Sequence, residues 1–334
     1  MKSRTKIWVI LGIVVFLVAA AAIAIPIFLD VNRYRDRVAA RLETALGKPV
    51  EIERLGLTVF PVLSFEVEGI KISNPRGFPK GHLLTAVMVR AELDLRALLR
   101  REVQVHSVRI VRPDIRLVSN RRGRWNFEIP TQRRTAPKKV ADDSAANFTL
   151  GTISTVEISD GNLQVSSLES GKVETFFGAS GLDADFEDVD LSALDPARAS
   201  EIRPGWENLL AALGFGKVVY AAEKKLISHG RFKTDGLILG PFRASSARSD
   251  IRLFEDEIFF DDLSFKFYDG RATGNLSSNL AGRRPRFRNH FRLSGVNLEK
   301  LMEAFPEGRG KLTGTLDGEM DLRGVLSQSS DPLR

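Results

Sequence analysis

Residues 311–322 read KLTGTLDGEMDL, and this stretch decides the fold class. Leucine, methionine and glycine fill its even positions, whereas threonine, aspartate and glutamate fill most of the odd ones. Because successive side chains of a strand point to opposite faces, the alternation predicts a strand with one apolar and one polar face. The small residues Gly314 and Gly318 on the apolar face are predicted to let the sheet curve there.

The same period of two recurs through most of the chain and predicts a mainly β protein. Further strands are expected at 50–59, 65–67, 103–117, 153–158, 162–165, 172–177, 230–239, 251–254 and 258–268. Short amphipathic helices are expected at 34–46, which Gly47 ends, and at 298–305, between Asn297 as N-cap and Pro306. A helical insertion is predicted near 194–228, and the polar segment 131–147 is predicted to be a linker.

The chain starts with a basic tip followed by 23 uncharged residues, Ile7 to Leu29. At 1.5 Å per residue a helix of this length reaches roughly 35 Å, enough to cross a hydrocarbon core of about 30 Å. We therefore expect residues 1–29 to form a cytoplasmic tip and a single transmembrane helix. The alternative is a cleaved signal peptide, for which Ala20 to Ala22 supply small residues. The long segment after the span is expected outside the cytoplasm.

The composition limits the chemistry that the protein performs. It has no cysteine, so disulfides and thiolate chemistry are excluded. Its histidines are scattered, and the sequence contains no serine-hydrolase elbow or phosphate-binding loop, so we expect a protein that is not an enzyme and has no cofactor or metal. A calcium site at Asp142–Asp143 or Asp261–Asp262 is a lesser alternative. A net charge of +7 favours anionic lipid over nucleic acid, for which no binding motif is present. Arg33, Arg35, Arg37 and Arg41, just after the span, are the membrane-surface candidates.

Several segments occur in a fixed order along the chain: GKPVEI (47–52), FP (60–61), EGIKISNP (68–75), LDLRALLRRE (93–102), VRPDIRL (111–117), GRWNF (123–127), YDGRATG (268–274) and GKLTG (310–314). In this order they resemble the AsmA family of bacterial envelope proteins. The resemblance covers nearly all of the chain and is weakest from 183 to 228. It implies an N-terminal α/β domain over 30–130 and a β-groove region over 148–334. Family members usually continue with further strands, so a short member or a truncated chain is expected.

The resemblance further implies a single-pass bacterial inner-membrane protein with its main body in the periplasm. Members of the family, which is related to chorein-type bridge proteins, are associated with outer-membrane biogenesis and with phospholipid transport. The apolar strand faces fit this function, since a curved antiparallel sheet forms a taco-like groove that shelters acyl chains. Candidate lining residues are Phe265, Phe267, Leu312, Leu316 and Met320.

The alternative is that the apolar face closes on itself as a β-sandwich. The protein would then be a non-catalytic scaffold or assembly factor that binds other envelope proteins. Periodicity alone does not separate this arrangement from an open groove. A membrane-anchored hydrolase is disfavoured because the sequence lacks the usual catalytic motifs.

Overall fold

The computed structural model describes residues 30–94, 97, 104–120, 124–128, 152–169, 171–190, 226–279 and 286–325. The predicted transmembrane helix and the predicted linker lie outside these ranges, as does the predicted helical insertion up to residue 225, while residues 226–228 begin a strand. Within the described ranges, no helix is both long and apolar enough to cross a membrane. The chain divides into two compact units, one of residues 1–115 and 126–149 and the other of residues 116–125 and 150–334.

The first unit is a small α/β structure. Its elements are η1 (Val31–Tyr34), α2 (Arg35–Leu46), β1 (Val50–Glu51), β2 (Arg54–Thr58), β3 (Ser64–Ser73), β4 (His82–Leu93), β5 (Val105–Val111) and the start of β6 (Asp114–Ser119). Strand β3 pairs antiparallel with β1, β2 and β4, and β4 pairs with β5 and with the start of β6. The predicted helix is confirmed: α2 ends at Gly47 in the left-handed conformation.

The apolar face of α2 forms the core of the first unit. Val38, Leu42 and Leu46, four residues apart, pack against the buried Val50 and Ile52. This spacing places the three side chains on one side of the helix, as the sequence indicates. The opposite side of α2 therefore stays in contact with solvent.

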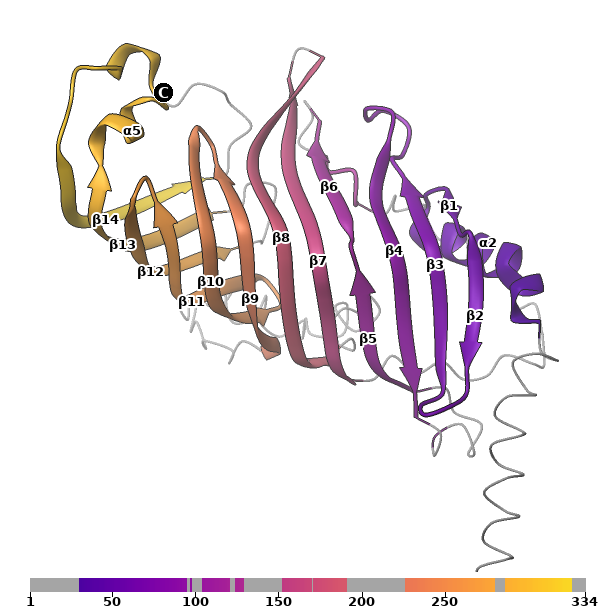
Figure 1. The fold of residues 1–334 in the computed structure, drawn as a ribbon. Coiled ribbons are helices and arrows are strands. Elements are labelled where there is room, and N and C mark those ends of the chain that lie inside the picture. The colour runs from indigo at the N-terminus through magenta and orange to yellow at the C-terminus, as the bar shows by residue number, and fades with distance from the viewer. Residues whose placement is uncertain are drawn as a thin grey trace, which may run out of the picture. The chain divides into compact units, whose positions relative to one another are not determined.

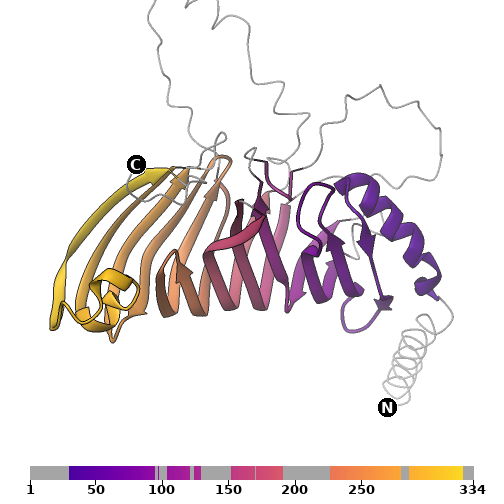
Figure 2. The same ribbon diagram turned by 90° about the horizontal axis from the view of Figure 1, so that it is seen from above.

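The second unit is a sheet in which each strand pairs antiparallel with the next along the chain. Its strands are β7 (Thr152–Glu169), β8 (Lys172–Asp190), β9 (Leu226–Leu239), β10 (Phe242–Phe254), β11 (Glu257–Phe267), β12 (Gly270–Asn279), β13 (Arg286–Asn297) and β14 (Thr315–Val325). Between β13 and β14 lie the short helices α5 (Leu298–Met302) and η3 (Pro306–Gly308). The mainly β prediction is confirmed, and the two views of the ribbon show that this sheet is strongly curved (Figure 1, Figure 2).

One face of this sheet, which we call the inner face, is apolar. Its buried members are Ala179, Leu237, Ala247, Leu263, Phe265, Ala272 and Phe291. Phe232 of β9 and Phe260 of β11 lie 5.6 Å apart between ring centroids, although a whole strand separates them. In a flat sheet their strands would be about 9.6 Å apart. The short distance between the rings indicates that the sheet is concave on the inner face.

Two glycines other than the predicted ones lie where neighbouring strands approach closely. Gly230 and Gly274 are packed so closely that an added Cβ would collide with the backbone carbonyls of Asp185 and His290 on neighbouring strands. An added Cβ at Gly318 would meet no atom within 4 Å, and Gly314 lies before β14 starts. The predicted role in the strand is therefore wrong for Gly314, which lies outside β14, and for Gly318 it stays a prediction.

Candidate functional site

The inner face of the second unit carries most of the predicted groove residues. Phe265 is only 5% exposed, and Phe267 and Met320 are half-buried against the same cluster. Leu316 is half-buried and lies opposite Val296. Leu312 is 50% exposed and falls outside the strands, since β14 begins at Thr315. The structure thus brings Phe265, Phe267 and Met320 together and leaves Leu312 apart.

Phenylalanines form a connected row along the inner face, from the turn between α5 and η3 through β10 and β11 to β13. Ring centroids lie 5.5 Å apart for Phe305–Phe242, 6.0 Å for Phe242–Phe267, 5.8 Å for Phe267–Phe265 and 5.5 Å for Phe265–Phe291. All of these pairs are edge-on, which is a favourable arrangement of aromatic rings. The sequence analysis missed Phe242, Phe291 and Phe305. The period of two in residues 286–293, where Phe287, Phe291 and Leu293 are separated by polar residues, was the available signal for Phe291.

Several hydroxyl groups on the inner face are hydrogen-bonded to the backbone. The hydroxyl of Thr234 lies within hydrogen-bond distance of the backbone carbonyls of Ser180 and Gly236, and that of Ser249 lies equally close to the backbone carbonyls of Asp250 and Asp261. The single proton of each hydroxyl is thus used within the sheet and is not available for a ligand. Ser278 differs, since its hydroxyl is buried without a partner among the described residues. The inner face therefore behaves as an apolar surface despite these hydroxyls.

Exposure of the inner face rises toward β14. Phe265 of β11 and Phe291 of β13 are 5% and 7% exposed, whereas Met320 of β14 is half-buried and Leu322 is 45% exposed. Met320 lies directly opposite Phe291, so these residues form one continuous surface. Of the positions on β11, β13 and β14, those on β14 are thus the ones that a ligand can reach.

The segment from α5 to η3 covers part of the inner face at one end. Its Phe305 packs edge-on against Phe242 of β10. Asn297 caps α5 by accepting the N–H of Lys300, and the Nζ of Lys300 donates to Asp269 in the turn between β11 and β12, at 2.8 Å. The hydrogen bond from Lys300 lowers the pKa of Asp269, and the same bond raises the pKa of Lys300. This ion pair links α5 to the sheet.

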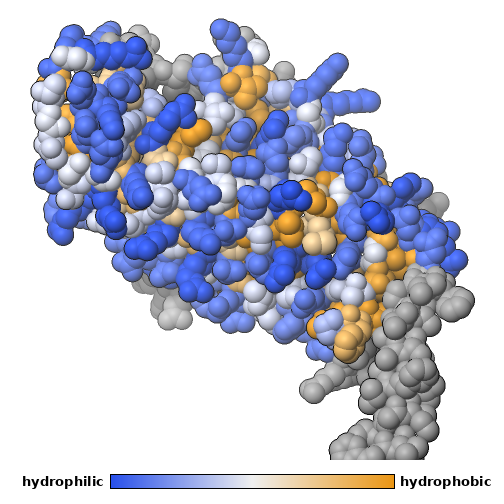
Figure 3. Space-filling model, in the orientation of Figure 1, coloured by the Kyte–Doolittle hydropathy of each residue, from blue (hydrophilic) through white to orange (hydrophobic). Residues whose placement is uncertain are grey.

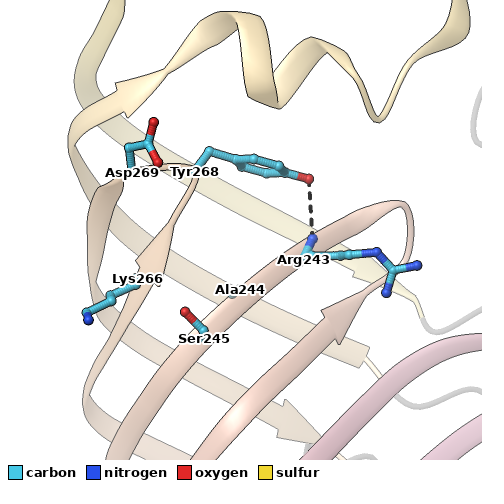
Figure 4. A pocket seen from close by; sticks show the side chains of 6 residues that line it. All are labelled: Arg243, Ala244, Ser245, Lys266, Tyr268 and Asp269. Carbon is cyan, nitrogen blue, oxygen red and sulfur yellow. Dashed lines mark hydrogen bonds between the residues drawn. The ribbon is translucent and has the colours of Figure 1, made fainter.

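Two open cavities lie along the same strands. One of about 280 Å³ is lined by residues of β7 to β10, among them Leu163, Ala179 and Leu237. The other, of about 370 Å³, lies at the ends of β10 and β11 (Figure 4). There the Tyr268 hydroxyl accepts the backbone N–H of Arg243, while the side chains of Arg243 and Lys266 point in different directions. This second cavity therefore lacks the converging charges of an anion site.

The outer face of the same sheet carries paired charges. Arg252 donates twice to Asp261, at 2.6 and 3.0 Å, and Arg292 donates to Glu319 at 2.6 Å. Arg292 also lowers the pKa of Glu319 through that hydrogen bond. Because the carboxylate of Asp261 is bound to Arg252, it is not free to serve as a ligand in the calcium site considered at Asp261–Asp262. The described residues also contain no cluster of three metal-ligating side chains.

Histidines lie beside carboxylates in both units, which the sequence did not indicate. His82 and Asp114 are 2.9 Å apart in the first unit, as are His290 and Asp321 in the second. Each pair joins residues about 30 positions apart in the chain, so no local motif marks it. In such a pair the carboxylate orients the imidazole ring.

The predicted membrane-surface arginines lie on two sides of the first helical segment. Arg33, Arg37 and Arg41, spaced four apart, are exposed, and the guanidinium groups of Arg33 and Arg37 lie 4.9 and 5.6 Å from the ring centroid of Tyr34. Arg35 instead contacts Asp36 and donates to the carbonyl of Glu53. Three of the four candidates therefore form an exposed basic stripe, and Arg35 helps to hold η1 and α2 on β2.

Comparison with protein families matches residues 1–189 to the AsmA family. Comparison with curated individual proteins gave no match. The matched region includes the whole of the first unit and strands β7 and almost all of β8. Since it covers 189 of the 334 residues, the chain belongs to the AsmA family.

Proposed function

We propose that the protein binds phospholipid acyl chains on the inner face of its second unit and conveys them in outer-membrane biogenesis. Residues 7–29 anchor it in the bacterial inner membrane, with the main body in the periplasm. Family membership supports a role in the cell envelope and in lipid transport. The protein acts by binding and carries out no reaction, so phospholipid and membrane are its partners.

The observation that carries this proposal is the exposed apolar strip on β14. Leu316, Met320 and Leu322 lie on the same side of the strand, and the outward residues between them are charged. An acyl chain laid on this strip removes apolar surface from water, which is worth roughly 25 cal/mol per Å². The charged residues on the other side remain hydrated.

A second candidate function, a non-catalytic scaffold for outer-membrane assembly, is favoured by the packing of Phe265. At 5% exposure its ring is enclosed by protein side chains, as in a closed core. Under this alternative the inner face is structural throughout, and the partner is another envelope protein.

The two functions are separated by placing a charge on the exposed strip. In Leu322→Asp, the new carboxylate stays near water, so the melting temperature should change by no more than about 3 °C. Phospholipid that co-purifies in mild detergent, measured by mass spectrometry, should fall several-fold because an acyl chain does not solvate a charge. Val173→Asp is the matched control, since Val173 of β8 is 48% exposed and lies elsewhere. Equal lipid in all three proteins would favour the scaffold.

A further inference from the structure

The hairpin between β2 and β3 ends in an exposed apolar tip. Phe60 is 71% exposed and Val62 is 45% exposed, with Pro61, also exposed, between them. Phe65, near the start of β3, is 42% exposed. We call residues 60–62 the hairpin tip. The space-filling view shows apolar side chains gathered at this end of β2 and β3 (Figure 3).

The tip is held rigidly although its side chains are exposed. Thr58 pairs with Ser64 and Leu57 with Phe65 on either side of it, so the strands are registered up to the turn. The backbone N–H of Leu93 in β4 donates to the carbonyl of Leu63 at 2.9 Å. The turn thus presents neighbouring apolar side chains to solvent at a defined place in the fold.

The tip lies close to the point where the described chain begins. Asn32 of η1 accepts the backbone N–H of Leu55 at 3.1 Å, and Arg35 donates to Glu53. From Leu55 to Phe60 is five residues, or about 17 Å of extended strand. Figure 1 shows the β2 arrowhead and the start of η1 at the same end of the first unit. A bilayer that holds residues 7–29 would thus be within reach of the tip.

We infer that the hairpin tip inserts into the headgroup region of the bilayer that anchors the chain. This inference rests on the proposed anchor. Phenylalanine and proline carry no charge to desolvate, and phenylalanine is among the residues that interfacial segments bury at the boundary between headgroups and acyl chains. The basic stripe of Arg33, Arg37 and Arg41 on the same unit is complementary to anionic headgroups. The tip gives the protein a second contact with the bilayer, which fixes its rotation about the anchor.

The small surface of the hairpin tip favours contact with the bilayer over contact with a partner protein. A stable protein interface buries about 800 Å² on each side, far more than three side chains provide. Insertion into lipid needs less surface, because the anchor already keeps the tip at a high effective concentration beside the membrane. Insertion then removes the exposed apolar surface of Phe60 and Val62 from water.

The absence of cysteine from the chain allows a direct test. The full chain carrying Phe60→Cys is labelled with the fluorophore NBD and reconstituted into phosphatidylethanolamine–phosphatidylglycerol vesicles, with or without doxyl-labelled phosphatidylcholine as a quencher. We expect the quencher to lower emission from position 60 about twofold or more. The matched label at Val173→Cys, 48% exposed in the second unit, should lose less than about a tenth.

A third label, at Val18→Cys in the predicted span, tests separately whether residues 7–29 are in the bilayer. Quenching at 18 but not at 60 would overturn the inserted tip and leave the anchor standing. Quenching at neither position would overturn both. A blue-shifted but unquenched label at 60 would mean that protein covers the tip, which also overturns the inference. Phe60 is largely exposed, so its replacement should leave the fold intact.

Discussion

Phe265 shows at the scale of one residue how an apolar strand position becomes structural. Its ring contacts those of Phe267 and Phe291 and is 5% exposed. We expect Phe265→Ala to lower the free energy of unfolding by about 3–5 kcal/mol, because it removes a buried ring and leaves a cavity. Chemical denaturation of the protein in detergent measures this change. Leu322→Ala, at an exposed position of the same face, should cost less than about 1 kcal/mol. Equal effects at the two positions would contradict the observed gradient of exposure.

Gly274 is the residue at which the close approach of neighbouring strands can be tested. An added methyl group there would meet the backbone carbonyl of His290. A backbone group in a paired strand does not rotate aside as the end of a flexible side chain does. We expect Gly274→Ala to destabilise the protein by several kcal/mol, as seen in its melting temperature. Gly318→Ala is the control, since an added methyl group meets no atom there. Replacing this glycine also lowers the conformational entropy of the unfolded chain, so the control should not be destabilised in the same way. A stable Gly274→Ala protein would show that the close approach is relieved by a small shift of the strands.

At the scale of elements, the sequence predicted those with strong local signals. α2 and the N-cap at Asn297 formed as expected, because helical spacing and capping residues act over a few positions. The helix after Asn297 ends earlier than predicted, at Met302, and a turn and the short η3 follow. Strand β14 also begins at Thr315, four residues after its predicted start.

Three strands were not predicted, because their own sequences favour a strand only weakly and pairing with neighbouring strands stabilises them. β12 contains two glycines and one large aliphatic residue, and β13 alternates arginine with phenylalanine rather than with β-branched residues. β4, with Leu83, Leu84, Val87 and Met88, has a spacing that also suits a helix. Pairing on both sides fixes these segments as strands, since tertiary context overrides weak local preference. For the same reason the contacts among Phe242, Phe267 and Phe305 could not be read from the sequence.

The link between α5 and the sheet gives a prediction at the scale of elements. A carboxyl whose folded pKa is lowered stabilises the fold above its ordinary pKa and loses that contribution as the pH falls through the folded value. Asp269 is such a group, since Lys300 lowers its pKa from the ordinary 3.8. The α5 contact should therefore persist from pH 7 to about pH 5 and weaken below the ordinary carboxyl range.

This behaviour can be followed with a fluorophore on Glu307→Cys, in the exposed η3 segment. We expect constant emission from pH 7 to about pH 5 and a change at lower pH. In the Lys300→Met background the emission should already be altered at pH 7, because Asp269 loses its partner. If Lys300→Met leaves emission and pH response unchanged, the contact between Phe305 and Phe242 alone holds the segment.

At the scale of the whole molecule, charge and apolar surface are separated between the faces of the second unit. The outer face carries ion pairs such as Arg252–Asp261 and Arg292–Glu319, while hydroxyls on the inner face are bound to the backbone. The proposed ligand would thus be recognised by its acyl chains rather than by its headgroup. We expect the co-purifying phospholipids to match the headgroup composition of the source membrane. Mass spectrometry of the extracted lipid, compared with the total membrane lipid, measures this.

The same separation predicts how bound lipid responds to salt. Ionic interactions between exposed groups are screened at high ionic strength, with a Debye length of about 3 Å at 1 M, whereas apolar burial is not weakened. Washing the protein in about 1 M salt should therefore release little of the bound lipid. The Leu322→Asp protein should be poor in lipid at every salt concentration. Strong enrichment of one headgroup, or release of most of the lipid by salt, would instead indicate recognition by charged side chains at the rim of the sheet.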